Sequence, residues 1–168
     1  MIDWYKKVVF ENYANFNGRA RRSEYWYFTL ANLIIVIILS VLDKVLGLKI
    51  GNSNSGILNT IYSLAVFLPG LAVMTRRLHD VGKSGWLLLI TYGIMIAAGI
   101  VGAVSAFSAI AGGGTPSFGL GLGLAVIVIL AVAIWMLILF CTNGDEGANQ
   151  YGPDPKLTGE EINEIGTE

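Results

Sequence analysis

A stretch of 61 residues between Lys83 and Asp145 contains no formally charged side chain. Charged residues make up about 25% of a typical soluble domain, where they cover the surface, but only 14% of this chain. The stretch holds two apolar segments, 86–111 and 118–141, and each is long enough to cross the ~30 Å hydrocarbon core of a bilayer as a helix. The sequence therefore predicts an integral membrane protein.

Two further apolar segments, 25–42 and 57–75, precede this stretch and also lack charged side chains. The first begins with four aromatic residues from Tyr25, a pattern typical of the membrane–water interface. Pro69 interrupts the second and predicts a kink. The expected fold class is an all-α membrane protein with four transmembrane helices, which form one domain over residues 25–141.

The two ends of the chain are expected to lie outside the hydrocarbon core. Over residues 1–24, apolar side chains recur on one face of a helical projection, which predicts an interfacial amphipathic helix followed by a basic segment. Residues 142–168 hold seven of the 12 acidic residues and predict an acidic tail. Its last part, 158–168, is as compatible with a short helix as with no regular structure.

Lysine and arginine are divided unevenly between the two sides of this topology. Nine of the 11 fall on the side that holds both chain ends and the loop after the second segment. Only Lys44 and Lys49 fall on the other side. Because cytoplasmic loops carry an excess of basic residues, we expect the N- and C-termini to be cytoplasmic.

The most polar segment follows the second apolar segment and contains Arg76, Arg77, His79, Asp80 and Lys83. On a continuing helix, Asp80 lies within reach of both Arg76 and Arg77. One interpretation is a phosphate or headgroup site with His79 as a proton carrier. The other is a stop-transfer cluster in which Asp80 neutralises arginines near the interface. The second is favoured, because one histidine without a nucleophile is a weak catalytic signature.

A second basic cluster, Arg19, Arg21 and Arg22 with Glu24, precedes the first apolar segment. Each basic residue near a membrane surface gains about 1 kcal/mol from anionic lipid. The cluster is therefore expected to contact anionic headgroups as well as to set the topology. Asp145, on the same predicted side, completes the candidate binding residues.

No cofactor is expected from the sequence. One histidine and one cysteine are too few for a zinc site, and Asp145, Glu146 and Asp154 lack the spacing of a calcium loop. Lys83 and Ser84 resemble the end of a phosphate loop, but position 77 is an arginine where that loop needs a glycine. A net charge of −1 gives no basis for nucleic-acid binding.

Three motifs in the chain resemble one bacterial family. They are Asn17-Gly18-Arg19-Ala20-Arg21-Arg22-Ser23-Glu24-Tyr25-Trp26, Arg76-Arg77-Leu78-His79-Asp80 with Gly82-Lys83-Ser84-Gly85-Trp86, and Gly144-Asp145 to Gly147 with Asn149 and Tyr151-Gly152-Pro153-Asp154. They stand in the order of the inner-membrane family catalogued as domain of unknown function 805, and span residues 4–155. The stretch 93–124 carries no matching motif. The resemblance implies a small multi-pass protein of the bacterial inner membrane and no known activity.

The favoured function is a non-enzymatic membrane protein that binds lipid headgroups or a partner protein at its cytoplasmic face. A channel or small-solute transporter is the alternative, although intramembrane charged residues, which such proteins usually carry, are missing from the apolar segments. A membrane enzyme that uses His79 and Asp80 as acid and base on a lipid headgroup is the least favoured. Gly119 and Gly123 permit close helix association within one chain or in a homo-oligomer.

Overall fold

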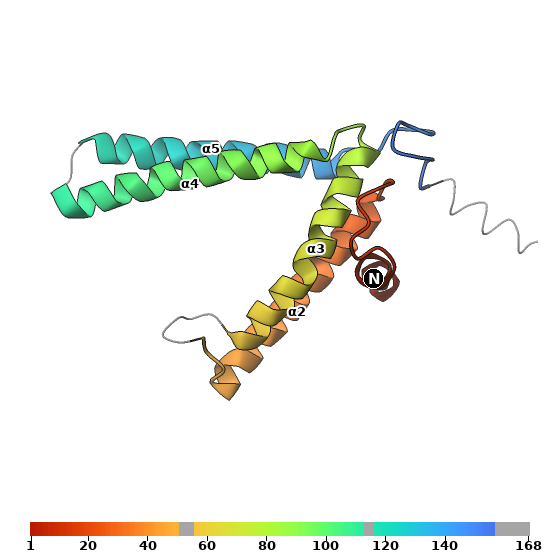
Figure 1. The fold of residues 1–168 in the computed structure, drawn as a ribbon, viewed down its shortest axis with the longest axis horizontal. Helices are drawn as coiled ribbons and strands as arrows, with labels where there is room; N and C mark the ends of the chain where they lie inside the picture. Colours follow the sequence, from red (N-terminus) through yellow and green to blue (C-terminus); the bar gives the residue numbers. More distant parts are fainter. Residues whose placement is uncertain (51–55, 113–115, 157–168) are drawn as a thin grey trace, which may run out of the picture. The chain divides into compact units, whose positions relative to one another are not determined.

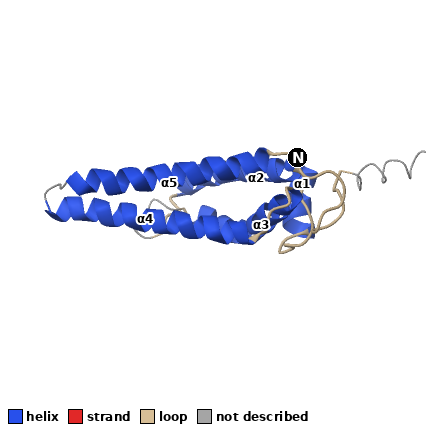
Figure 2. Ribbon diagram, turned by 90° about the horizontal axis from the view of Figure 1, so that it is seen from above, coloured by secondary structure: helices blue, strands red, loops and turns tan. Residues whose placement is uncertain are grey.

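The computed structural model describes residues 1–50, 56–112 and 116–156, without the side chains of 112–119. The regular elements of these ranges are the helices α1 (Ile2–Lys6), η1 (Lys7–Glu11, a π-helix), α2 (Arg22–Leu46), α3 (Ile57–Asp80), α4 (Trp86–Gly112) and α5 (Pro116–Cys141) (Figure 2). Helices α2 to α5 are long and apolar enough to cross a membrane, which confirms the all-α, four-helix fold class. The predicted acidic end, 158–168, lies outside the described residues.

The chain divides into two compact parts, Met1–Lys83 with Asn143–Glu168, and Ser84–Thr142. In the second part, α4 and α5 pack against each other as a hairpin (Figure 1). Their backbones approach closely at Gly121, where a Cβ atom would overlap the hydroxyl of Ser105. A Cβ atom at Gly123 would meet nothing within 4 Å, and the side chain of Gly119 lies outside the description. The close helix contacts described in this hairpin therefore involve small residues other than Gly123.

In the first part, α2 and α3 run antiparallel, side by side (Figure 1). Both helices extend beyond the predicted apolar segments, so that Glu24 and Asp43 belong to α2 and Asp80 ends α3. Glu24, Asp43 and Asp80 are buried. Because a buried charge is costly unless it is paired, each of these carboxylates marks a specific contact.

Asp43 caps the start of α3 from the neighbouring helix. The N-cap residue Gly56 provides no side chain, and the Asp43 carboxylate accepts hydrogen bonds from the backbone N–H groups of Leu58 at 3.0 Å and Asn59 at 3.1 Å. A negative charge is also favourable at the positive end of a helix dipole. A Cβ atom at Gly56 would overlap this carboxylate, so glycine is what allows its approach.

Replacing Asp43 with alanine is expected to lower the free energy of unfolding by about 0.5–2 kcal/mol, the usual effect of losing a helix cap. The measurement is thermal unfolding of the purified protein in detergent. Lys44→Ala is the matched control, because this neighbouring side chain is exposed. Equal stability of the two variants would contradict the capping role of Asp43.

Regular structure in the N-terminal segment ends at Glu11, before the last apolar residue of the predicted amphipathic face, Phe16. The segment that follows it is held by α3, where the hydroxyl of Tyr13 donates to the backbone carbonyl of Ala65 at 2.7 Å. Pro69 has no N–H, so the carbonyl four residues earlier loses its helical partner. In a membrane protein such a group needs a partner from the protein itself, and Tyr13 provides it while α3 continues through Pro69.

Candidate functional site

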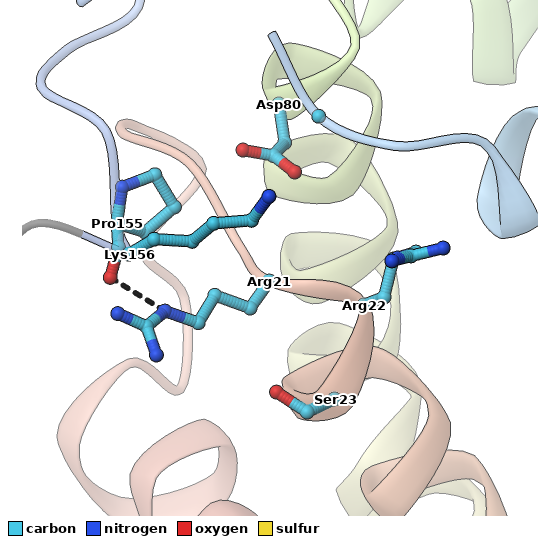
Figure 3. Close-up of a pocket in the computed structure, with 7 residues that line it drawn as sticks. Arg21, Arg22, Ser23, Asp80, Pro155 and Lys156 are labelled. Atoms are coloured by element: carbon cyan, nitrogen blue, oxygen red, sulfur yellow. Dashed lines mark hydrogen bonds between the residues drawn. The ribbon is translucent and has the colours of Figure 1, made fainter. Parts of the chain in front are cut away.

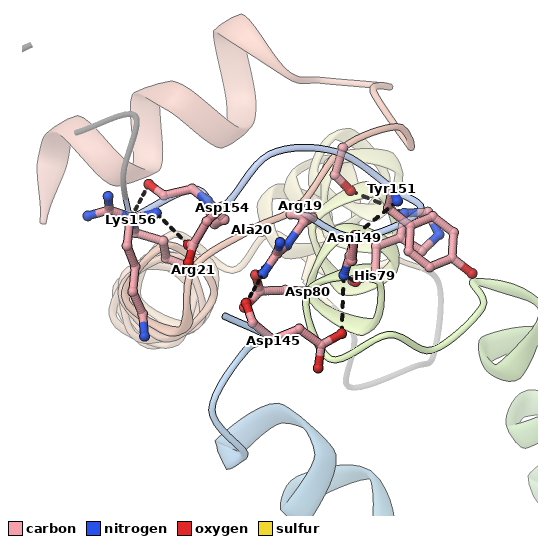
Figure 4. A network of polar contacts seen from close by, with 12 residues as sticks. Arg19, Ala20, Arg21, His79, Asp80, Asp145, Asn149, Tyr151, Asp154 and Lys156 are labelled. Carbon is pink, nitrogen blue, oxygen red and sulfur yellow. Dashed lines mark hydrogen bonds and ion pairs between the residues drawn. The ribbon is translucent and has the colours of Figure 1, made fainter. Parts of the chain in front are cut away.

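Three segments that are far apart in the sequence meet at the end of the α2–α3 pair where α2 starts and α3 stops (Figure 4). They are residues 17–24, residues 76–80 and residues 144–156. We call this assembly the polar end. Its members lie in the first compact part of the chain, and they include most of the charged residues that the sequence analysis selected.

Asp80 is the centre of the polar end. One of its carboxylate oxygens accepts a hydrogen bond from Nε of Arg19 at 3.0 Å, and the other accepts from Nη1 of Arg77. The side chains of Arg19, Arg77 and Asp80 are all buried. Two arginines thus share one carboxylate, and this group of three carries a surplus positive charge.

A second ion-pair group lies beside it. Nη1 of Arg76 donates to the Glu24 carboxylate at 2.6 Å, and Nζ of Lys7 lies 3.3 Å from the other carboxylate oxygen. The backbone N–H of Ala20 donates to the carbonyl of Arg76 at 3.0 Å. These contacts join the N-terminal segment, the start of α2 and the end of α3.

Residues 144–156, which we call the tail segment, contact the first of these two ion-pair groups mainly through their backbone. Arg19 donates from its two terminal nitrogens to the carbonyls of Gly147 and Asp145, both at 2.5 Å. The N–H of Asp145 in turn donates to the backbone carbonyl of Asp80 at 2.8 Å. Arg19 therefore binds α3 and the tail segment at the same time, which explains why the three sequence motifs come together.

His79 takes part in the same docking. Its ring stacks on Tyr151 with centroids 3.8 Å apart (Figure 4), and Asn149 donates to its backbone carbonyl at 2.9 Å. Nδ1 of His79 lies 3.2 Å from the carbonyl oxygen of Gly18. A carbonyl only accepts, so Nδ1 carries the hydrogen of this bond. The buried ring thus connects the end of α3 with the N-terminal segment and the tail segment, which is a structural role.

Asp154 organises the tail segment itself. Its carboxylate accepts hydrogen bonds from the N–H groups of Lys156 at 2.9 Å and Gly147 at 3.2 Å. The bond from Lys156 is the main reason that the pKa of Asp154 lies below its ordinary value near 3.8, with the Gly147 bond and the charge of Arg19 acting in the same direction against burial.

The lowered pKa of Asp154 predicts an acid-sensitive tail. Stability from this group is fully present above the ordinary pKa near 3.8 and is lost as the pH falls through the lowered pKa of the folded state. The protection factors of the tail amides in hydrogen exchange are therefore expected to fall in that acidic window. Asp154→Asn should remove the step, and an unchanged pH profile in that variant would contradict the assignment.

A pocket of about 310 Å³ opens beside this network (Figure 3). Its lining residues are Arg21, Arg22, Ser23, Asp80, Gly144, Pro155 and Lys156. Nε of Arg21 donates to the carbonyl of Pro155 at 2.5 Å and fixes one wall. Arg22 and Lys156 are the other cationic residues of the lining, and Lys156 comes from the tail segment. The pocket is thus built jointly by the start of α2 and the docked tail.

The residues predicted as a binding set therefore separate into three groups. Arg19, Glu24, Arg76, Arg77, His79, Asp80 and Asp145 hold the three segments together through side chain or backbone. Arg21 and Arg22 line the pocket, and Asp80 does so as well, whereas the side chain of Lys83 is exposed. The sequence allowed Asp80 to pair with Arg76 or with Arg77. In the structure Asp80 pairs with Arg77, whereas Arg76 pairs with Glu24.

Sequence reasoning missed four pocket residues, Ser23, Gly144, Pro155 and Lys156, and the ion pair of Lys7. Lys156 is the single basic residue after Lys83 and lies two residues after the third motif, a signal that could have selected it. Within the described ranges, no group of three His, Cys, Asp or Glu side chains is arranged to hold a metal ion.

Comparison with known proteins identifies the family. The model described as "Protein of unknown function (DUF805)" matches residues 13–153. This chain belongs to the DUF805 family. Inner membrane protein YhaH of Escherichia coli (strain K12) is 38% identical over 158 residues, which cover 93% of this chain and 98% of that protein. Inner membrane protein YhaI of the same strain is 37% identical over 157 residues, with the same coverage of both chains. No solved structure matches.

Membership in DUF805 confirms the resemblance drawn from the three motifs. The matched region includes the first two segments of the polar end and the third as far as residue 153. With four helices able to cross a membrane and relatives named as inner membrane proteins, this DUF805 protein is a multi-pass inner membrane protein.

Proposed function

We propose that this DUF805 protein is a non-enzymatic membrane protein that binds anionic lipid headgroups at its polar end. The observation that supports this best is the pocket of about 310 Å³, whose lining includes three cationic side chains, Arg21, Arg22 and Lys156. Its one acidic lining residue, Asp80, already binds Arg19 and Arg77. Cationic side chains therefore outnumber acidic ones in the lining of the pocket.

The start of α2 adds the positive end of a helix dipole. Arg21 is the N-cap residue and Arg22 the first residue of a 25-residue helix, and no side-chain cap satisfies its first N–H groups. Basic side chains at the positive end of a helix dipole are electrostatically unfavourable. A bound anion would remove that conflict, because it would interact favourably with the dipole and with both arginines.

The level of the pocket along α2 also suits a headgroup. Only a few residues after Arg22, α2 exposes the large aromatic side chains Trp26 and Tyr27, which favour the membrane–water interface. The excess of lysine and arginine on this side of the chain supports a cytoplasmic orientation. His79 and Asp80, the pair that an enzyme would use, are engaged in structural contacts, which favours binding over catalysis.

The test is lipid retention in nanodiscs made from phosphatidylcholine and phosphatidylglycerol, measured by native mass spectrometry. The variant Arg21→Gln with Arg22→Gln is expected to retain about 25-fold less phosphatidylglycerol, at about fivefold for each basic residue. The matched control is Lys44→Gln with Lys49→Gln, because Lys44 lies in the last turn of α2 and Lys49 shortly after its end. Equal retention by both double variants, with unchanged thermal stability, would rule out the pocket as the headgroup site.

A further inference from the structure

The first helical segment of the chain lies across the α2–α3 pair. Helices α1 and η1 are continuous over residues 2–11, and we call this segment the crossing helix. Figure 1 shows it nearly end-on, whereas α2 and α3 run across the page. Figure 4 looks along α2 and shows the crossing helix, in pale red, from its side. Because α2 and α3 are long and apolar enough to span a membrane, a helix that crosses them runs along the membrane plane.

Contacts with both neighbours hold the crossing helix in this direction. The ring of Tyr5 stacks on Phe28 of α2 with centroids 5.9 Å apart, and its hydroxyl lies 3.2 Å from the hydroxyl of Tyr62 on α3. Val8 is fully buried, with 0% exposure. One side of the crossing helix therefore packs on the protein, and its remaining sides face what surrounds the protein.

The π-helix changes which side chains share one of these remaining sides. On a regular α-helix of 3.6 residues per turn, Phe10 would fall about 20° from Asp3 and about 80° from Ile2. Over Lys7–Glu11 the hydrogen bonds run from i to i+5, so each residue turns less and Phe10 rotates away from Asp3 towards Ile2. Ile2 is 67% exposed and Phe10 is 77% exposed. Two large apolar side chains thus stand out together, away from the charged Asp3 and Glu11.

We propose that the crossing helix rests on the bilayer surface beside the polar end and inserts Ile2 and Phe10 between the lipids. This inference does not depend on the headgroup pocket. The level along α2 supports it, because the partner of Tyr5 in α2, Phe28, directly follows the exposed aromatic residues Trp26 and Tyr27. Such residues favour the membrane–water interface, where amphipathic helices lie in the plane of the membrane.

The area of this apolar side favours lipid over a protein partner. A stable protein interface buries about 800 Å² on each partner. A large aromatic side chain supplies only about 150–250 Å², so Ile2 and Phe10 together fall well short of that area. Lys6 is exposed between them in the sequence, and a lysine can keep its ammonium group at the headgroups while its methylene chain lies along apolar surface.

Insertion of the crossing helix would fix the depth of the polar end. Nζ of Lys7 lies 3.3 Å from the Glu24 carboxylate, which also accepts from Arg76 at 2.6 Å. The crossing helix is therefore tied by an ion pair to the same group that joins the start of α2 to the end of α3. A change in its depth would be passed on directly to these buried residues.

The experiment measures the depth of nitroxide labels by electron paramagnetic resonance. The variants Ile2→Cys, Asp3→Cys, Phe10→Cys and Glu11→Cys are made one at a time with Cys141→Ala, because the native cysteine is exposed. Each labelled protein is placed in nanodiscs of phosphatidylcholine and phosphatidylglycerol, and collisions with oxygen, which concentrates in lipid, are compared with collisions with a water-soluble nickel complex.

We expect the labels at Ile2 and Phe10 to lie about 5–10 Å into the boundary between headgroups and acyl chains. Their ratio of oxygen to nickel accessibility should exceed that of the labels at Asp3 and Glu11, which are the matched controls on the charged side. All four native side chains are exposed, so the substitutions should leave the fold intact, and an unchanged thermal unfolding curve checks this.

Three results would overturn the inference. Equal ratios at Phe10 and Asp3 would mean that the π-helix does not turn Phe10 towards the lipid. High nickel accessibility at all four positions would place the crossing helix in water. Shielding of Ile2 and Phe10 from both reagents would mean that a protein surface covers them. Arg21→Gln with Arg22→Gln should leave the ratios unchanged, so failure of the headgroup proposal and failure of this one are distinguishable.

Discussion

Replacement of Asp80 with asparagine is expected to lower the free energy of unfolding by about 3–5 kcal/mol, the effect of removing one partner from a buried ion pair. Asp80 is the shared partner of Arg19 and Arg77, and Arg77 is fully buried at 0% exposure. The neutral amide removes the negative charge that these two buried guanidinium groups share. The loss should therefore exceed that of any single surface ion pair, which is about 0–1 kcal/mol.

Thermal unfolding of the purified protein in detergent measures this effect. Asp145→Asn is the matched control, because the Asp145 carboxylate is exposed and accepts from Asn149 at 3.2 Å, while its docking contacts use the backbone. We expect a change below about 1 kcal/mol for that control. Similar losses in the two variants would mean that Asp80 is not the centre of the polar end.

Replacement of Gly144 with alanine is expected to release the tail segment while the helices stay folded. A Cβ atom at this position would overlap the Asp80 carboxylate, with its Cγ only 2.5 Å away. Two arginines hold that carboxylate, so it cannot easily move. Overpacking of this kind costs about 1–3 kcal/mol, which corresponds to an increase of about 5- to 150-fold in the exchange rate of the docked amides.

Hydrogen exchange followed by mass spectrometry tests this prediction on peptides that cover residues 143–156. The amide of Asp145, which donates to the Asp80 carbonyl, should lose protection first. Gly99→Ala is the control, because a Cβ atom there meets nothing within 4 Å. Full protection of the tail in Gly144→Ala would show that the close approach of Gly144 to Asp80 is not required for docking.

The sequence accounts for the number and type of the helices. Long runs such as 86–111 contain no group that needs water, so their position follows from composition and length alone. The sequence pattern was a less reliable guide to where each helix begins and ends. Glu24 and Asp43 lie inside α2 because each finds a partner on another element, Arg76 for the first and the start of α3 for the second. No property of their own neighbours predicts this.

The choice of ion-pair partners shows the same limit. Spacing on one helix allowed Asp80 to pair with Arg76 or with Arg77. The structure selects Arg77, because Glu24 from α2 takes Arg76 and Arg19 approaches Asp80 from the N-terminal segment. This choice depends on contacts between residues more than 50 positions apart.

The sequence by itself determined that this chain is a four-helix membrane protein with three polar motifs, and the even number of apolar segments predicted that they share one side. Only the tertiary structure decided that the motifs form one buried network beside a pocket, and that Lys156 completes the pocket. The physical reason is how far apart along the sequence the interacting residues lie. Burial in lipid depends on the apolar content of each segment, whereas an ion pair or a pocket depends on which distant segments are brought within a few ångströms of each other.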